Sequence, residues 1–178
     1  GISLRKKDIV KSIDSLALSQ AIAGNLEKLN FNAEKVYDKV SFSGINQYLA
    51  SLNSNNIDKK YDLLFADRTL QYSRNLEESI KNLLNILLPS GIISLILPIH
   101  SGNKATLFLA KDDIFCFSKE YVTESLSKLG LVQLEVIDLK TLKSAASSAP
   151  SKENSGNPSE NIPKDYSEIF FVFQKNAN

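Results

Sequence analysis

The feature that most constrains this chain is a repeated order of apolar and amphipathic segments in its middle third. Residues 61–66 (YDLLFA) form a continuous apolar run, which is typical of a strand covered on both faces. Residues 75–87 then carry leucine and isoleucine at helical spacing, and Pro89 predicts the end of that helix. A second apolar run follows at 92–97. This alternation predicts an α/β fold, Rossmann-like, with a mostly parallel sheet and helices on both faces.

Capping residues predict where two helices begin and end. Asn75 is followed three residues later by Glu78, a spacing that predicts a capping box. Ser118 precedes a second amphipathic segment, and Gly130 follows it at the position where a left-handed residue often ends a helix. The sequence therefore predicts helices that start at these caps.

The first third of the chain predicts two further strand and helix pairs. Residues 8–13 are expected to form a short strand, and Ser15 is expected to cap a helix over 16–29. Residues 35–42 alternate between apolar and polar, as in a strand with one exposed face, and a second helix should cover 45–52.

The last third predicts an antiparallel hairpin around a long insert. Residues 131–139 and 168–174 are both apolar enough to be strands, and they are expected to pair at the edge of the sheet. Between them, residues 144–165 contain six serines, three asparagines and three prolines and almost nothing to bury, which predicts a disordered insert. We expect one domain over residues 1–178, within which this insert lies.

Composition excludes several functional classes. Lysine and arginine (21) nearly balance aspartate and glutamate (20), which argues against a nucleic-acid binder or a membrane-surface module. The longest apolar run, residues 91–98, is far shorter than the ~20 residues that cross a bilayer, and no signal peptide is recognisable. One cysteine and one histidine exclude a disulfide framework and an ordinary zinc site. We therefore expect a reducing compartment, the cytoplasm.

The second half of the chain resembles the class I S-adenosylmethionine-dependent methyltransferases. The resemblance rests on residues 61–66 (YDLLFA), 85–91 (NILLPSG) and 92–97 (IISLIL), where that family reads fDlv, LkPGG and an apolar strand. Ser90 stands where the family usually has its first glycine. The final helix and two strands also fit the family's reversed terminal hairpin. The resemblance implies this fold and, in active members, methyl transfer from S-adenosylmethionine.

The glycines argue against a working cofactor site in this chain. Such a site needs a glycine-rich turn after the first strand, because a Cβ there would block the cofactor. No two of the seven glycines lie within four residues of each other, and none lies between Asp14 and Gly24. The same fact excludes a P-loop or a dinucleotide fingerprint. We therefore expect the domain not to bind S-adenosylmethionine appreciably.

A group within this fold that fits these losses is the N-terminal domain of the anamorsin family, which acts in cytosolic iron–sulfur assembly. The order and spacing of elements from Asp8 to Gln174 resemble that domain. The resemblance implies a non-catalytic interaction domain, a protein partner such as a diflavin reductase, and clusters held only by a C-terminal region outside this chain. No catalytic, cofactor-binding or metal-binding residue is then assigned here. An active methyltransferase, or a pseudo-methyltransferase subunit of another complex, remains the alternative.

Five residues or short segments could take part in a catalytic or binding site, and each also has an ordinary structural interpretation. Asp14 could be the ribose-binding acid of a second strand, or a capping carboxylate. Residues 67–72 could line a reaction centre, or form a surface loop with Leu70 or Tyr72 tucked in. His100 could be a general base or a plain surface residue. Cys116 could be redox-active or a buried small hydrophobe. Residues 5–7 form a basic run typical of a solvated end.

Overall fold

The structure is a computed structural model that describes residues 14–17, 39–43, 45–52, 59–140 and 166–177. The chain divides into two compact units, residues 1–51 and residues 52–178, which are described separately below. The expectation of one domain over the whole chain stays a prediction. The predicted strand at 8–13, the predicted insert at 144–165 and most of the predicted helix at 16–29 lie outside the described residues.

In the first unit, two short strands pair in parallel. Strand β1 (Asp14–Ala17) runs beside β2 (Lys39–Phe42), with Asp14 opposite Lys39. Helix α3 (Ile45–Ser51) follows and confirms the predicted second helix. The expected helix start at Ser15 is wrong, because residues 15–17 belong to β1, where parallel pairing with β2 takes precedence over local helix capping.

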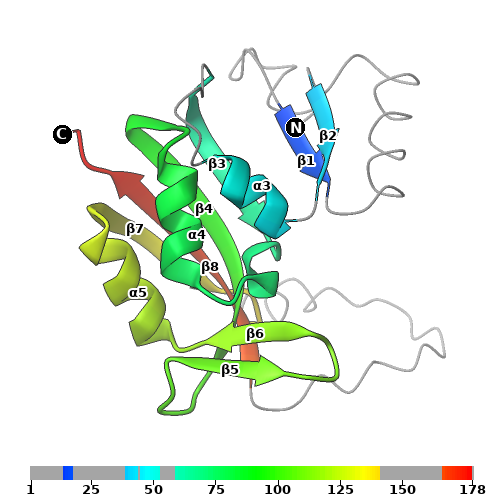
Figure 1. Cartoon of the computed structure of the whole chain (residues 1–178). Helices are drawn as coiled ribbons and strands as arrows, with labels where there is room; N and C mark the ends of the chain where they lie inside the picture. Colours follow the sequence, from blue (N-terminus) through cyan, green and yellow to red (C-terminus); the bar gives the residue numbers. More distant parts are fainter. Residues whose placement is uncertain (1–13, 18–38, 44, 53–58, 141–165, 178) are drawn as a thin grey trace, which may run out of the picture. The chain divides into compact units, whose positions relative to one another are not determined.

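The second unit is built on a mixed sheet (Figure 1). Its strands are β3 (Tyr61–Asp67), β4 (Leu87–His100), β5 (Thr106–Leu109), β6 (Ile114–Phe117), β7 (Leu131–Asp138) and β8 (Tyr166–Lys175). They run in the order β5-β6-β4-β8-β7, and β3 pairs with β4. The central strand is β4, since it pairs with β3, β6 and β8.

The expectation of a mostly parallel sheet is wrong. Only β3–β4 and β4–β6 are parallel in the second unit, whereas β4–β8, β5–β6 and β7–β8 are antiparallel. The predicted antiparallel hairpin at the edge of the sheet is confirmed, with β7 as the edge strand and β8 between β7 and β4. The β5–β6 hairpin was not predicted, and it adds a further antiparallel pair.

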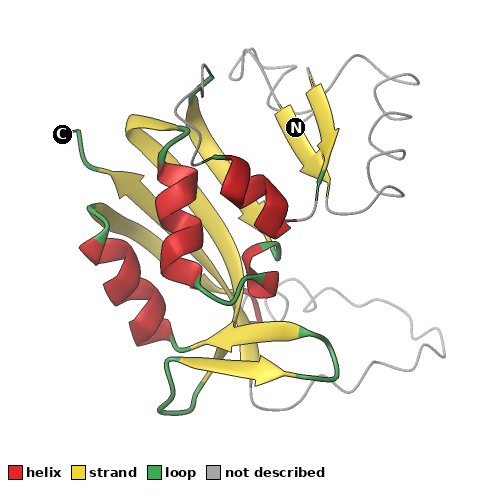
Figure 2. Cartoon of the chain, in the orientation of Figure 1, coloured by secondary structure: helices red, strands yellow, loops and turns green. Residues whose placement is uncertain are grey.

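Two helices cover one face of this sheet. Helix α4 (Leu76–Leu84) packs on β4, α5 (Lys119–Lys128) packs on β7, and the two helices contact each other (Figure 2). A 3-10 turn, η1 (Leu70–Tyr72), precedes α4. Both predicted N-caps are confirmed: Asn75 accepts from the backbone N–H of Glu78, and Ser118 accepts from that of Tyr121. Gly130 takes the predicted left-handed conformation after α5, with φ of 79°.

The core lies between the sheet and these helices. The most deeply buried side chains on this face come from β4 and β8, namely Ile93, Leu95, Leu97, Phe171 and Phe173. On the same face the Lys175 ammonium donates to the carbonyl of Leu84, the last residue of α4, and to that of Leu87, the first residue of β4. The pKa of Lys175 is lowered, mainly by desolvation on burial and to a smaller extent by the positive charge of Lys60. This lysine ties the end of β8 to the end of α4.

The opposite face of the sheet corrects the expectation that β3 is covered on both sides. Leu63 and Phe65 are 50% and 59% exposed there. The Phe65 ring contacts Phe170 of β8 edge-on, with ring centroids 6.4 Å apart. Among the described residues of this unit, both long helices lie on the other face, so helices on both faces are not found there either.

An irregular stretch near the start of β4, where its pairing with β3 shifts register between Leu87 and Ile92, explains one departure from the methyltransferase pattern. Ser90 has φ of 59°, a left-handed conformation that suits glycine better than serine. Its carbonyl accepts a hydrogen bond from the Gln174 side chain. Gly91 is sterically required, since a Cβ there would lie 2.7 Å from Leu87 Cδ1 and 2.9 Å from the Leu88 carbonyl oxygen. The serine is therefore tolerated at some cost in strain, while the following glycine is needed.

The burial of α4 generates a stability prediction. The Ile80 side chain is fully buried, whereas the Leu84 side chain, one turn later, is only partly buried. Leu84 is also the last residue of α4, so the helix ends earlier than predicted. Ile80→Ala should lower the free energy of unfolding by about 2–5 kcal/mol. Leu84→Ala should cost roughly half as much, since less apolar area leaves water there. Urea denaturation measures both, and equal losses would show that the buried face of α4 is assigned wrongly.

Candidate functional site

The carboxyl ends of β3 and β4 form the best candidate site in the second unit. These two strands are parallel, and ligands of α/β proteins usually bind beyond the carboxyl ends of such strands. Asp67 and Arg68 lie at the end of β3, and His100 is the last residue of β4. The loop predicted at 67–72 is thus placed at this edge, with Leu70 buried and Tyr72 exposed. We call this region the carboxyl edge.

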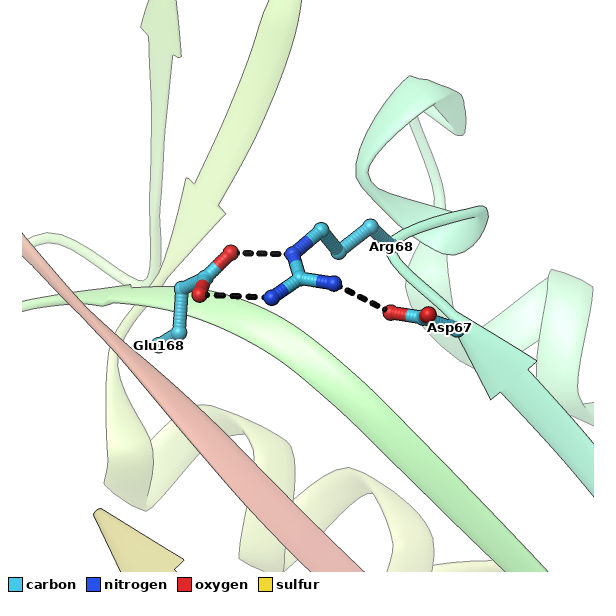
Figure 3. Close-up of polar contacts among 3 residues, drawn as sticks. All are labelled: Asp67, Arg68 and Glu168. Atoms are coloured by element: carbon cyan, nitrogen blue, oxygen red, sulfur yellow. Dashed lines mark hydrogen bonds and ion pairs between the residues drawn. The ribbon is translucent and has the colours of Figure 1, made fainter. Parts of the chain in front are cut away.

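An arginine bridges two carboxylates at this edge (Figure 3). Arg68 Nη2 donates to Glu168 Oε2 at 2.8 Å, Arg68 Nε donates to Glu168 Oε1, and Arg68 Nη1 donates to Asp67 Oδ1 at 2.8 Å. The fork joins the loop after β3 to the start of β8, 100 residues away in sequence. The hydrogen bond to Glu168 is the main reason that the pKa of Arg68 is raised. The bridge is structural in the first instance, because it joins two segments far apart in the sequence; one guanidinium between two carboxylates leaves this cluster with a net negative charge.

Arg68 also holds a strained backbone. Its φ is 50°, in the left-handed region that disfavours residues with a Cβ. Its own backbone N–H donates to the carbonyl of Ile96 on β4, which extends the strand pairing by one residue. The arginine is therefore fixed at both ends, by its backbone on β4 and by its side chain on β8.

His100 is buried at the end of β4, not a plain surface residue. Its side chain is 7% exposed, and its Nδ1 accepts a hydrogen bond from the backbone N–H of Gly102 at 3.0 Å. The neutral imidazole must then carry its proton on Nε2. In that form Nε2 is a donor without a lone pair to accept a proton. The geometry therefore disfavours the general-base role that the sequence suggested for His100.

In the first unit, Asp14 is coupled to a tyrosine. It lies within the described part of β1, opposite Lys39, rather than in a loop after the strand. Tyr48 of α3 is half-buried, and its pKa is raised, first by burial and then by the negative charge of Asp14. Asp14 is therefore a strand carboxylate that influences Tyr48. It begins β1, so it does not lie at the carboxyl end of the strand, where the ribose-binding interpretation requires an acid.

Cys116 of β6 is buried, as the sequence predicted. It is 1% exposed, and desolvation, with a smaller contribution from Asp112, raises the pKa of its thiol to about 11. A thiol with this pKa carries almost no thiolate at neutral pH, so its nucleophilicity is low. A redox role for Cys116 has no support in this environment.

The remaining features are the basic run at the start of the chain, metal-ligating clusters and membrane-spanning helices. Residues 5–7 are outside the described residues. Within the described residues, no three His, Cys, Asp or Glu side chains gather as a metal site would require. In the same part of the chain, no helix combines the length and the apolar character needed to span a bilayer.

Comparisons with known proteins identify the fold. No family model and no curated protein sequence matches the chain. Among solved structures, geranyl diphosphate methyltransferase in complex with S-adenosylmethionine superposes with a TM-score of 0.69 and 12% identity, covering 98% of this chain and 73% of that one. A methyltransferase from Clostridium acetobutylicum gives 0.59 and 13%, covering 98% and 78%. The [4+2]-cyclase SpnF gives 0.63 and 16%, covering 99% and 71%.

These likenesses show a methyltransferase-like α/β fold, as the sequence resemblance implied. At 16% identity or less they show the fold alone, and one of the three proteins is a cyclase. They do not single out the anamorsin family, so that narrower resemblance stays a prediction. The sequence had not linked Arg68 to Glu168, since nothing local marks a partner so far along the chain.

The thiol of Cys116 gives a chemical prediction. At pH 8 the native protein should react with a disulfide reagent far more slowly than the protein in 6 M guanidinium, because burial both hides the sulfur and disfavours the thiolate. Absorbance of the released thiol measures the rate. Equal rates in native and unfolded protein would mean that β6 is open to solvent.

The backbone of Arg68 gives a second prediction. Arg68→Ala and Arg68→Gly both remove the ion pairs with Glu168 and Asp67, so their difference isolates the strain of the left-handed φ. We expect the glycine variant to be more stable than the alanine variant by about 1 kcal/mol. Urea denaturation compares them. An alanine variant of equal or higher stability would show that φ is not held in this region.

Proposed function

We propose that this chain belongs to a class I S-adenosylmethionine-dependent methyltransferase. The observation that carries the proposal is the superposition on geranyl diphosphate methyltransferase with its cofactor, which extends over 98% of this chain. The sequence motifs at 61–66 and 85–91 support it independently. In such a protein the carboxyl edge, with Arg68 and His100, would lie where the methyl acceptor binds.

Two parts of the cofactor site that this function needs are misplaced or missing in this chain. Asp14, which the sequence offered as a ribose-binding acid, is the first residue of β1 and therefore lies away from the carboxyl end, where nucleotides bind in folds of this kind. The glycine-rich turn is missing, because no glycine lies between Asp14 and Gly24. The residues present therefore do not fit the complete cofactor, and we derive no step of methyl transfer from them.

The second candidate is a non-catalytic interaction domain of the anamorsin type. The missing glycine-rich turn favours it, since such a domain needs no cofactor. It would act in the cytoplasm with a protein partner such as a diflavin reductase, and it would hold no metal or cofactor itself. The two candidates differ in one measurable property, which is the affinity for the cofactor.

Isothermal titration with S-adenosylmethionine and S-adenosylhomocysteine tests the proposal. A methyltransferase chain should bind one of them saturably with a Kd below about 1 mM, which corresponds to about −4.1 kcal/mol. Asp14→Asn should change that binding by less than about threefold, because Asp14 lies at the amino end of β1 and not at its carboxyl end, where such folds bind nucleotides.

Asp62→Asn is the matched control for this titration. Asp62 is an exposed carboxylate on β3, and its replacement should leave the affinity unchanged while removing the same charge. The circular dichroism spectrum checks that both variants are folded. Absence of saturable binding to the folded chain would overturn the proposal in favour of the non-catalytic candidate.

A further inference from the structure

We propose that the outer edge of β5 is a docking surface for a second copy of this chain, and that the β5 strands of the two copies pair antiparallel about a two-fold axis at Leu107. This surface is independent of methyl transfer and of cofactor binding. Three properties of the edge point to it, which are its outward backbone groups, its unprotected apolar strand and the complementary charges at its two ends.

The hydrogen-bond register turns the polar backbone groups of two β5 residues outward. Strand β5 is the last strand on its side of the sheet (Figure 1). The N–H of Ser118 donates to the Ala105 carbonyl at 2.9 Å, which makes this a hydrogen-bonded pair of the β5–β6 ladder. Such pairs alternate with non-bonded ones, so the N–H and C=O of Thr106 and Phe108 point away from β6. No other described strand pairs with them.

Strand β5 also lacks the features that protect the other edges of this sheet. The edge strand β7 has a register shift between Gln133 and Glu135, β3 has one between Tyr61 and Leu63, and both strands carry charged residues. Bulges and charges of this kind oppose pairing with a further strand. In contrast, β5 (TLFL) has no charge, no proline and no register shift against β6, and its Phe108 side chain is 49% exposed.

A second copy of β5 matches this edge in hydrogen bonding and in side chains. With the two-fold axis at Leu107, Thr106 of each copy lies opposite Phe108 of the other, so every outward N–H meets an outward C=O. The Phe108 ring already contacts Phe115, with ring centroids 5.0 Å apart. In the pair, the two Phe108 rings become diagonal neighbours across the axis, a separation that aromatic side chains can bridge.

The charges at the two ends of β5 favour the same antiparallel partner. The exposed Lys104 precedes the strand, whereas the exposed turn after it contains Lys111, Asp112 and Asp113, which together carry a net charge of −1. Antiparallel pairing brings the start of one strand beside the end of the other, so each Lys104 lies near the acidic turn of the second copy. The formal net charge of +1 leaves little overall repulsion between two copies.

The dimer should be weak and reversible because β5 is short. Stable interfaces bury more than ~1,000 Å², and a strand of four residues offers only part of that area. We expect a Kd of roughly 10–100 µM. Sedimentation equilibrium of the whole chain, from about 5 µM to about 1 mM, measures it.

Proline at an outward position tests the pairing without breaking the β5–β6 ladder. Thr106→Pro removes an N–H that points away from β6, which is the position where an edge strand accepts proline. It should weaken dimerisation at least about tenfold, because two hydrogen bonds of the symmetric pair are lost and the ring obstructs the edge. The matched control Thr106→Val keeps the N–H and should stay within about threefold of the unmodified chain. Circular dichroism checks that both variants are folded.

Side-chain variants separate this edge from the other exposed apolar surfaces. Phe108→Ser should weaken dimerisation at least about fivefold. Val132→Ser on β7 and Phe65→Ser on β3 remove similarly exposed side chains and should leave the Kd unchanged. Lys104→Glu should weaken the dimer about threefold, and adding Asp112→Lys should restore it.

Amide hydrogen exchange locates the contact in the unmodified chain. The Thr106 and Phe108 amides should exchange more slowly as the protein concentration rises, whereas the Leu107 amide, which the register directs to β6, should not change. If Thr106→Pro does not fold, this measurement and Phe108→Ser decide.

Four results would overturn the proposal. They are a monomer at about 1 mM, a dimer that folded Thr106→Pro leaves intact, a dimer that Phe65→Ser or Val132→Ser disrupts, and outward amides protected at every concentration in a monomer. The last result would assign the edge to residues of the same chain outside the described ones. None of the four bears on cofactor binding, which the titration above tests separately.

Discussion

The antiparallel pairing of β8 with β4 is the interaction on which the rest of the second unit depends. Nine residue pairs join the strands, from Ile92 opposite Gln174 to His100 opposite Tyr166. The pairing brings the last described strand of the chain into the middle of the sheet, between β4 and β7. The buried phenylalanines of β8, the Lys175 contact with the end of α4 and the Arg68–Glu168 bridge all follow from it. Forming this long-range pairing costs chain entropy. Burial of the many apolar side chains of β8 compensates for that cost and stabilises the pairing.

The sequence was sufficient for the features that depend on local chemistry. Periodicity placed α4 and α5, and the caps at Asn75 and Ser118 are side-chain to backbone bonds made within three residues. The burial of Cys116 followed from its apolar neighbours. Strand direction was harder, because an apolar run such as β8 has the same pattern whether its neighbour is parallel or antiparallel. For this reason the prediction of a mostly parallel sheet was wrong.

The β5–β6 hairpin and the contacts of the carboxyl edge could not be predicted either, because their local sequence does not mark the partners that they pair with. The β5–β6 hairpin has only four residues in each strand and lacks an Asn-Gly turn; Asp113 supplies the left-handed residue instead, with φ of 53°. Glu168 is 100 residues from the arginine that it binds. The sequence placed His100 after a strand, but its burial depends on β8 and on the backbone of Gly102. Loops at this edge were predictable; their partners were not.

The different exposure of the groups at the carboxyl edge follows from the unequal lengths of β3 and β4. The β3–β4 register ends where Asp67 lies opposite Ile96, while β4 continues for four more residues to His100. Beyond Ile96, β4 is flanked by β8 on one side, and by β6 at Ile99. The end of β4 is therefore enclosed, whereas Arg68 at the shorter strand's end remains 44% exposed. One strand end thus carries partly solvated charges joined by ion pairs, and its neighbour carries a buried imidazole held by a backbone N–H.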